Sequence, residues 1–143
     1  MPTRLAISSH LEHDGDGIVR YRIEAENRDF RGAAWAWGNE TDAAGLAALL
    51  RGFPSGVNSK IEYGFGSSGT GVVNLLFESV NPQGHCRVWV ATKSEYAAEG
   101  SREHNSAFVS VDFLPAALDD FCRDLAKFKP RRLNEAILSR DAS

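Results

Sequence analysis

The segment Ile18–Glu26 alternates strictly between apolar and charged side chains, and it constrains the fold more than any other part of the sequence. The apolar set is Val19, Tyr21, Ile23 and Ala25, and the charged set is Arg20, Arg22, Glu24 and Glu26. Successive side chains of a strand point to opposite faces of a sheet. The segment therefore predicts a strand with one buried face and one solvated face.

Six further segments carry strand patterns, and two carry helical patterns. The predicted strands are residues 4–9, 30–38, 58–66, 72–80, 85–93 and 107–113, and the predicted helices are residues 42–51 and 115–128. The order is three strands, a helix, four strands and a helix. Because strands joined by short turns pair antiparallel, we expect an α+β fold. It would have one antiparallel sheet of about six to seven strands, with both helices packed on one face.

The chain of 143 residues has the size of a single domain. We expect residues 1–128 to form that domain and residues 129–143 to be a C-terminal tail, with a turn of helix at residues 133–138. Trp35 and Trp37 share one side of a predicted strand beside the first helix. Their position favours the interior between the sheet and that helix.

Composition limits the partners and the compartment of the protein. The net charge of -3 does not suit nucleic-acid binding. The one dense basic run, residues 127–132, lies at the end of a predicted helix, where cations complement the helix dipole, and this interpretation is favoured over a phosphate or nucleic-acid patch. Cys86 and Cys122 lie in apolar segments without zinc-ligand spacing, which suits a reducing compartment. No apolar stretch is long enough to span a membrane, and the first residues lack the apolar run of a signal peptide. These features predict a cytoplasmic protein that binds neither nucleic acid nor membranes.

No motif in the sequence predicts catalysis, a cofactor or a metal. His10, His13 and the acidic residues between 12 and 16 lie in a segment with the composition of a turn. Gly64, Gly66 and Gly69 have dinucleotide-motif spacing, but a strand and not a helix follows them. His85 and Cys86 are adjacent, so on a strand they face opposite ways. We therefore expect a protein that is not an enzyme.

Without such a motif, the surface is where function is expected. The charged side of segment 18–26 should lie away from the helices, and segment 85–93 adds an arginine and a tryptophan. The predicted partner-binding residues are Arg20, Arg22, Glu24, Glu26, Arg87 and Trp89. Acidic residues around these strands would suit a basic protein partner, through electrostatic complementarity.

The layout resembles the WapI-type immunity proteins, small bacterial proteins that neutralise a cognate toxin. The resembling segments are Ile18–Glu26, Asp29–Gly32 with Trp35 and Trp37, the helix with Leu46, Leu49 and Leu50, Ile61–Tyr63, Val73–Leu75, Gly84–Val88, and Phe108–Phe113 with Leu118 and Phe121. Together they cover roughly residues 18–128. The resemblance implies a non-enzymatic protein whose partner is a toxin domain, and it assigns no toxin-contacting residue.

Two other functions stay open at the sequence level. One is a small-molecule-binding or enzymatic domain that uses the open face of the sheet, with Glu62, Tyr63, His85 and Arg87 as candidates. The other is a homodimer formed through the uncovered sheet face. Exposure of Trp89 or Phe108 on that face would favour the homodimer.

Overall fold

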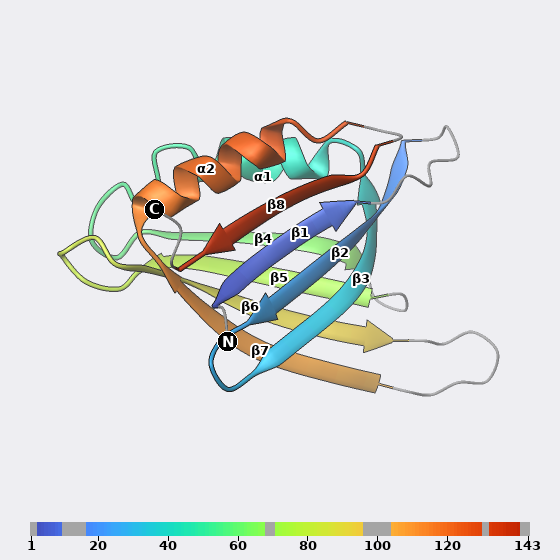
Figure 1. Ribbon diagram of the computed structural model, residues 1–143, viewed down its shortest axis with the longest axis horizontal. Helices are drawn as coiled ribbons and strands as arrows, with labels where there is room; N and C mark the ends of the chain where they lie inside the picture. The colour runs from blue at the N-terminus through green and yellow to red at the C-terminus, as the bar shows by residue number, and fades with distance from the viewer. Residues whose placement is uncertain (1–2, 10–16, 68–70, 96–103, 130–131, 141–143) are drawn as a thin grey trace.

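The computed structural model describes residues 3–9, 17–67, 71–95, 104–129 and 132–140 (Figure 1). The described chain forms eight strands and two helices. In order they are β1 (Arg4–Ser9), β2 (Ile18–Glu26), β3 (Arg31–Asn39), α1 (Asp42–Leu50), β4 (Lys60–Ser67), β5 (Gly71–Ser79), β6 (Cys86–Glu95), β7 (His104–Phe113), α2 (Pro115–Ala126) and β8 (Asn134–Ser139). The α+β class is thus confirmed.

The strands form two antiparallel sheets of four strands each, so the expectation of a single sheet is wrong. The first sheet has the order β3-β2-β1-β8, and the second has the order β4-β5-β6-β7. Each sheet turns one apolar face toward the other, and the largest fully buried side chains include Tyr21 and Ile23 from the first sheet and Phe65 and Phe77 from the second. The strands of both sheets show the same alternation of apolar and polar residues, because each sheet has one buried inner face and one solvated outer face.

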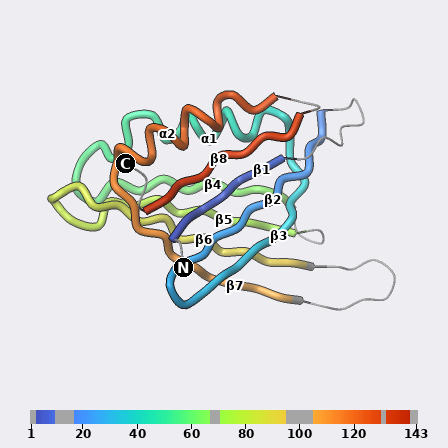
Figure 2. Tube along the Cα trace, viewed as in Figure 1, coloured from blue at the N-terminus to red at the C-terminus, as the bar shows by residue number. Residues whose placement is uncertain are grey.

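The sheets approach most closely where β3 crosses the second sheet, and β3 contacts all four of its strands (Figure 2). Its inner side carries Gly32, Ala34 and Ala36, which are small enough for this approach. A Cβ added to Gly32 would lie 2.6 Å from the Cβ of Ala107 on β7. The larger residues of β3 therefore have to point outward.

This crossing explains why the prediction for the two tryptophans is wrong. Trp35 and Trp37 lie on the outer side of β3, and Trp37 is 47 % exposed. Tryptophan and alanine do alternate between the two sides of β3, but the alanines point into the core and the tryptophans point outward. Where two sheets touch closely, the small residues occupy the interior.

The two helices pack against each other rather than together on one sheet face. Helix α2 lies along β8, and α1 contacts β4 (Figure 1). Two tyrosines bond the backbone on either side of the connection between β3 and α1. The Tyr21 hydroxyl donates to the carbonyl of Asn39, the last residue of β3, at 2.6 Å, and the Tyr63 hydroxyl donates to the carbonyl of Asp42, the first residue of α1, at 3.1 Å. Burial raises the pKa of Tyr21 to about 12, and it also raises the pKa of Tyr63.

Part of the segment expected to be a C-terminal tail belongs to the first sheet. Residues 134–139 form β8, a strand rather than a turn of helix, and β8 pairs antiparallel with β1. The side chains of Ala136 and Leu138 are buried in the core. The side chain of Asn134 fixes the preceding turn, because its amide nitrogen donates to the Lys129 carbonyl and to the Ser9 hydroxyl.

Candidate functional site

The six predicted partner-binding residues lie on two separate faces. Arg20, Arg22, Glu24 and Glu26 lie on the outer face of the first sheet, and Arg87 and Trp89 lie on the outer face of the second sheet. These faces point away from each other because the inner faces of the two sheets pack together. The structure therefore does not unite the six residues in one site, and each face has its own chemistry.

The outer face of the first sheet neutralises most of its own charge. Glu24 lies within ion-pair distance of three guanidinium groups: Arg22 at 3.3 Å, Arg31 at 3.6 Å and Arg4 at 3.8 Å. Arg4 also bonds Glu26 at 2.7 Å, and this hydrogen bond raises the pKa of Arg4. Glu24 and Glu26 are thus already occupied by arginines of the same protein.

The remaining arginine of that face is stacked on aromatic rings. The guanidinium carbon of Arg20 lies 4.4 Å from the ring centre of Trp35 and 5.7 Å from that of Trp37. Arg22 lies over Trp35 as well, at 5.1 Å. Such stacking stabilises the cation through the π-faces of the rings, while the buried Nε of Arg20 has no hydrogen-bond partner in the described part of the chain. The outer face of the first sheet therefore presents a tightly interlocked surface.

The outer face of the second sheet carries a prominent aromatic stack. The rings of Trp89 on β6 and Phe108 on β7 are parallel, with centres 5.0 Å apart and planes 7° apart. The Trp89 Nε1 donates to Glu78 at 2.8 Å, and the Arg87 guanidinium lies 5.4 Å from the Trp89 ring centre. Trp89 is thus held in place, while Phe108 is 65 % exposed. A large, fixed, exposed aromatic pair is typical of an interaction surface.

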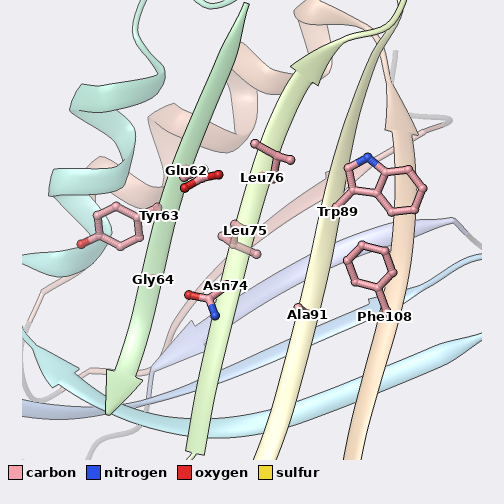
Figure 3. Close-up of a pocket in the computed structure, with 9 residues that line it drawn as sticks. All are labelled: Glu62, Tyr63, Gly64, Asn74, Leu75, Leu76, Trp89, Ala91 and Phe108. Atoms are coloured by element: carbon pink, nitrogen blue, oxygen red, sulfur yellow. The ribbon is translucent and has the colours of Figure 1, made fainter. Parts of the chain in front are cut away.

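A hollow of about 810 Å³ lies beside this aromatic stack (Figure 3). It is lined by Glu62, Tyr63, Gly64, Asn74, Leu75, Leu76, Trp89, Ala91 and Phe108. Its lining includes two small residues, Gly64 and Ala91, at neighbouring positions on β4 and β6 that flank Asn74 on β5. Glu62 on β4 and the aromatic stack on β6 and β7 lie on opposite sides of β5 (Figure 3). The hollow is open on the sheet face, so it suits a protruding group of a larger partner.

The four candidates for a small-molecule site fall into two different places. Glu62 and Tyr63 line the hollow just described, whereas His85 and Arg87 line another of about 420 Å³ at the end of the same sheet. There the His85 Nδ1 lies 2.8 Å from the amide nitrogen of Asn81, and Arg87 forms an ion pair with Asp112 at 2.6 Å. The structure does not bring these four side chains together.

Among the described residues, neither cysteine is an activated nucleophile, and no cluster of side chains has the composition of a metal site. Burial raises the pKa of the Cys86 thiol, and burial together with Asp119 raises the pKa of Cys122 to about 11. Both thiols are therefore protonated at neutral pH and are poor nucleophiles. In the described ranges, no three His, Cys, Asp or Glu side chains gather as metal ligands, and His10 and His13 lie outside those ranges. Neither described helix is long and apolar enough to cross a bilayer.

Phe108 and Asn74 belong to this site but are not among the six residues predicted from the sequence. The signal for Phe108 is its parity on β7: Val109, Val111 and Phe113 point inward, so the neighbouring positions point outward. A phenylalanine at a strand position that faces solvent indicates an exposed aromatic side chain. Comparison of the chain with protein-family models, with curated proteins and with solved structures gives no significant match.

Proposed function

We propose that this chain is a non-enzymatic protein-binding domain whose interface is the outer face of the second sheet. The observation that carries this proposal is the Trp89–Phe108 stack, which stands exposed beside an open hollow. Aromatic side chains are enriched among the residues that dominate binding energy, above all when neighbouring groups fix them in place. Here Glu78 and Arg87 fix Trp89.

The shape of the hollow supports a macromolecular partner over a small molecule. Small-molecule sites usually enclose most of the surface of their ligand. The hollow is large enough for a ligand, but it opens on a sheet face and offers mainly walls of apolar side chains. A protruding segment of another protein would fill it while the surrounding strands contact the rest of the partner.

The resemblance of the sequence to WapI-type immunity proteins suggests the class of partner, a bacterial toxin domain. The hypothesis predicts a toxin gene beside the gene of this chain, and the direct test is to express the chain together with the toxin domain that such a gene encodes. We expect growth to be restored and a one-to-one complex to form with the purified toxin domain. Cells that die despite normal levels of the folded protein would rule out this partner.

A homodimer through the same face is a second candidate, and the exposure of Phe108 favours it. Isologous dimers use one self-complementary patch, and a projecting aromatic beside a hollow has that form. Light scattering coupled to size-exclusion chromatography separates the two candidates. A monomer at micromolar concentration would favour the hetero-partner.

A further inference from the structure

The hollow on the second sheet contains a carboxylate that the protein does not neutralise. Among the residues that line the hollow, Glu62 is the one charged side chain. Within the described ranges, it has no hydrogen-bond donor and no ion-pair partner. Lys60 lies two residues earlier on the same side of β4, yet it forms no ion pair with Glu62.

Two other carboxylates of this outer face already have partners within the protein. Glu78 accepts the hydrogen bond from Trp89 at 2.8 Å, and Asp112 pairs with Arg87 at 2.6 Å. Among the carboxylates of this face whose side chains are described, Glu62 therefore remains open to a cation from outside. Asn74 adds an amide oxygen in the same hollow, and its side chain also has no partner among the described residues.

The rest of the hollow suits the aliphatic part of a long basic side chain. Leu76 and Ala91 offer apolar surface between the acidic flank and the aromatic flank. Phe108 has one ring face against Trp89, and its 65 % exposure leaves the remainder of the ring accessible. Lysine and arginine bury an apolar stem while the charged head stays near polar groups, and their heads are attracted to aromatic faces.

We propose that this hollow receives a lysine or arginine side chain of the protein partner, with its cation beside Glu62 and its stem against Leu76 and Ala91. This inference rests on the proposed function, and it specifies the chemistry of the partner. The net charge of -3 would also attract a basic surface over longer distances. The partner segment would then carry a basic residue next to an apolar residue that contacts the Trp89–Phe108 stack.

The test is a selection of random peptides displayed on phage against the full-length chain. Parallel selections use the wild type, Glu62→Lys and Glu135→Lys, the last being a matched charge reversal on the outer face of the first sheet. Circular dichroism and thermal unfolding check that each variant is folded. We expect wild-type binders to carry lysine or arginine beside an apolar residue, and the E62K selection to lose this preference.

The enriched peptides then serve as defined probes in fluorescence polarisation. Their affinity should fall on the order of tenfold for E62K and several-fold for Glu62→Gln, and should change little for E135K. Peptides that lack basic residues but lose binding when Phe108→Ser is introduced would overturn this inference and leave the proposed function standing. Failure to enrich any peptide, or peptides insensitive to both E62K and F108S, would overturn both.

Discussion

The two outer faces of this protein have similar residue types but use them differently. On the first sheet, arginines bond Glu24 and Glu26 and stack on the tryptophans of the same face. On the second sheet, one aromatic ring is fixed while the other stays exposed, and one carboxylate stays without a partner in the described ranges. The difference teaches that charged and aromatic composition alone does not mark a binding face. What matters is whether the groups are already bound within the protein.

The largest expected effect is on partner binding. Replacing Phe108 with serine removes the exposed ring beside the hollow, and we expect affinity for the partner to fall by about 2 kcal/mol, or roughly thirtyfold. The matched substitution on the first sheet is Trp37→Ser, which removes a ring that is 47 % exposed. It should change affinity by less than about threefold. Calorimetric titration of the partner into both variants measures the two affinities. Equal losses of affinity would contradict the proposal that only the second sheet binds the partner.

The second prediction concerns the interior that both faces share. Gly32→Ala would place a Cβ 2.6 Å from Ala107 and 3.1 Å from the Thr92 hydroxyl, between the sheets. Such overpacking costs about 2 kcal/mol of unfolding free energy. Gly45→Ala on α1 is the control, because its Cβ would have no neighbour closer than 3.6 Å. Urea unfolding of the two variants should show a loss only for G32A, and an unchanged G32A would mean that the sheets are not so closely packed.

The third prediction uses Tyr21, which is buried beneath the first sheet. Its pKa in the folded protein is about 12, above the usual value of 10.0, so the phenol is neutral in both folded and unfolded states below pH 10. Its contribution to stability is fully present there. As pH rises from 10 to 12 the unfolded chain ionises first, so stability falls by on the order of 1 kcal/mol per pH unit. Thermal unfolding measured at several pH values in this range should show a smaller loss of stability per pH unit in Tyr21→Phe than in the wild type. An identical loss in both proteins would mean that other groups cause it.

The smallest expected effect is a difference in stability between two carboxylate substitutions, one on each face. Glu24→Gln removes the group shared by Arg4, Arg22 and Arg31, and we expect a loss of about 1 kcal/mol in unfolding free energy. Glu62→Gln should cost close to nothing, because Glu62 has no ion pair to lose among the described residues. The difference should shrink in high salt, since salt screens exposed pairs. Equal costs in urea unfolding at low salt would contradict the contrast.

The sequence predicts the local elements well because each depends on nearby residues. The alternation of Val19, Tyr21 and Ile23 with charged residues predicts β2, and Pro115 begins the last helix as expected. The strand β8 escapes prediction because it has only two buried positions and forms by pairing with β1, far away in the chain. Alternation also cannot tell one sheet from two, since either arrangement gives every strand one buried face.

The candidate site is less predictable than the fold. Arg87 and Trp89 are part of the outer face of the second sheet, as segment 85–93 suggests, but the hollow depends on which strands are neighbours. Glu62, Asn74 and Phe108 come from three strands, and only the register brings them to one surface. The orientation of Trp35 and Trp37 depends on the close crossing of β3, which no local pattern reveals.

Side-chain footprinting of the complex by carbene labelling tests the central claim most directly. The protein is labelled alone and bound to its partner, and the modification of each residue is compared by mass spectrometry. We expect labelling of Trp89 and Phe108 to fall on binding, while labelling of Trp37 stays unchanged. Protection of Trp37 with Phe108 still fully labelled would contradict the account, because it would place the partner on the first sheet.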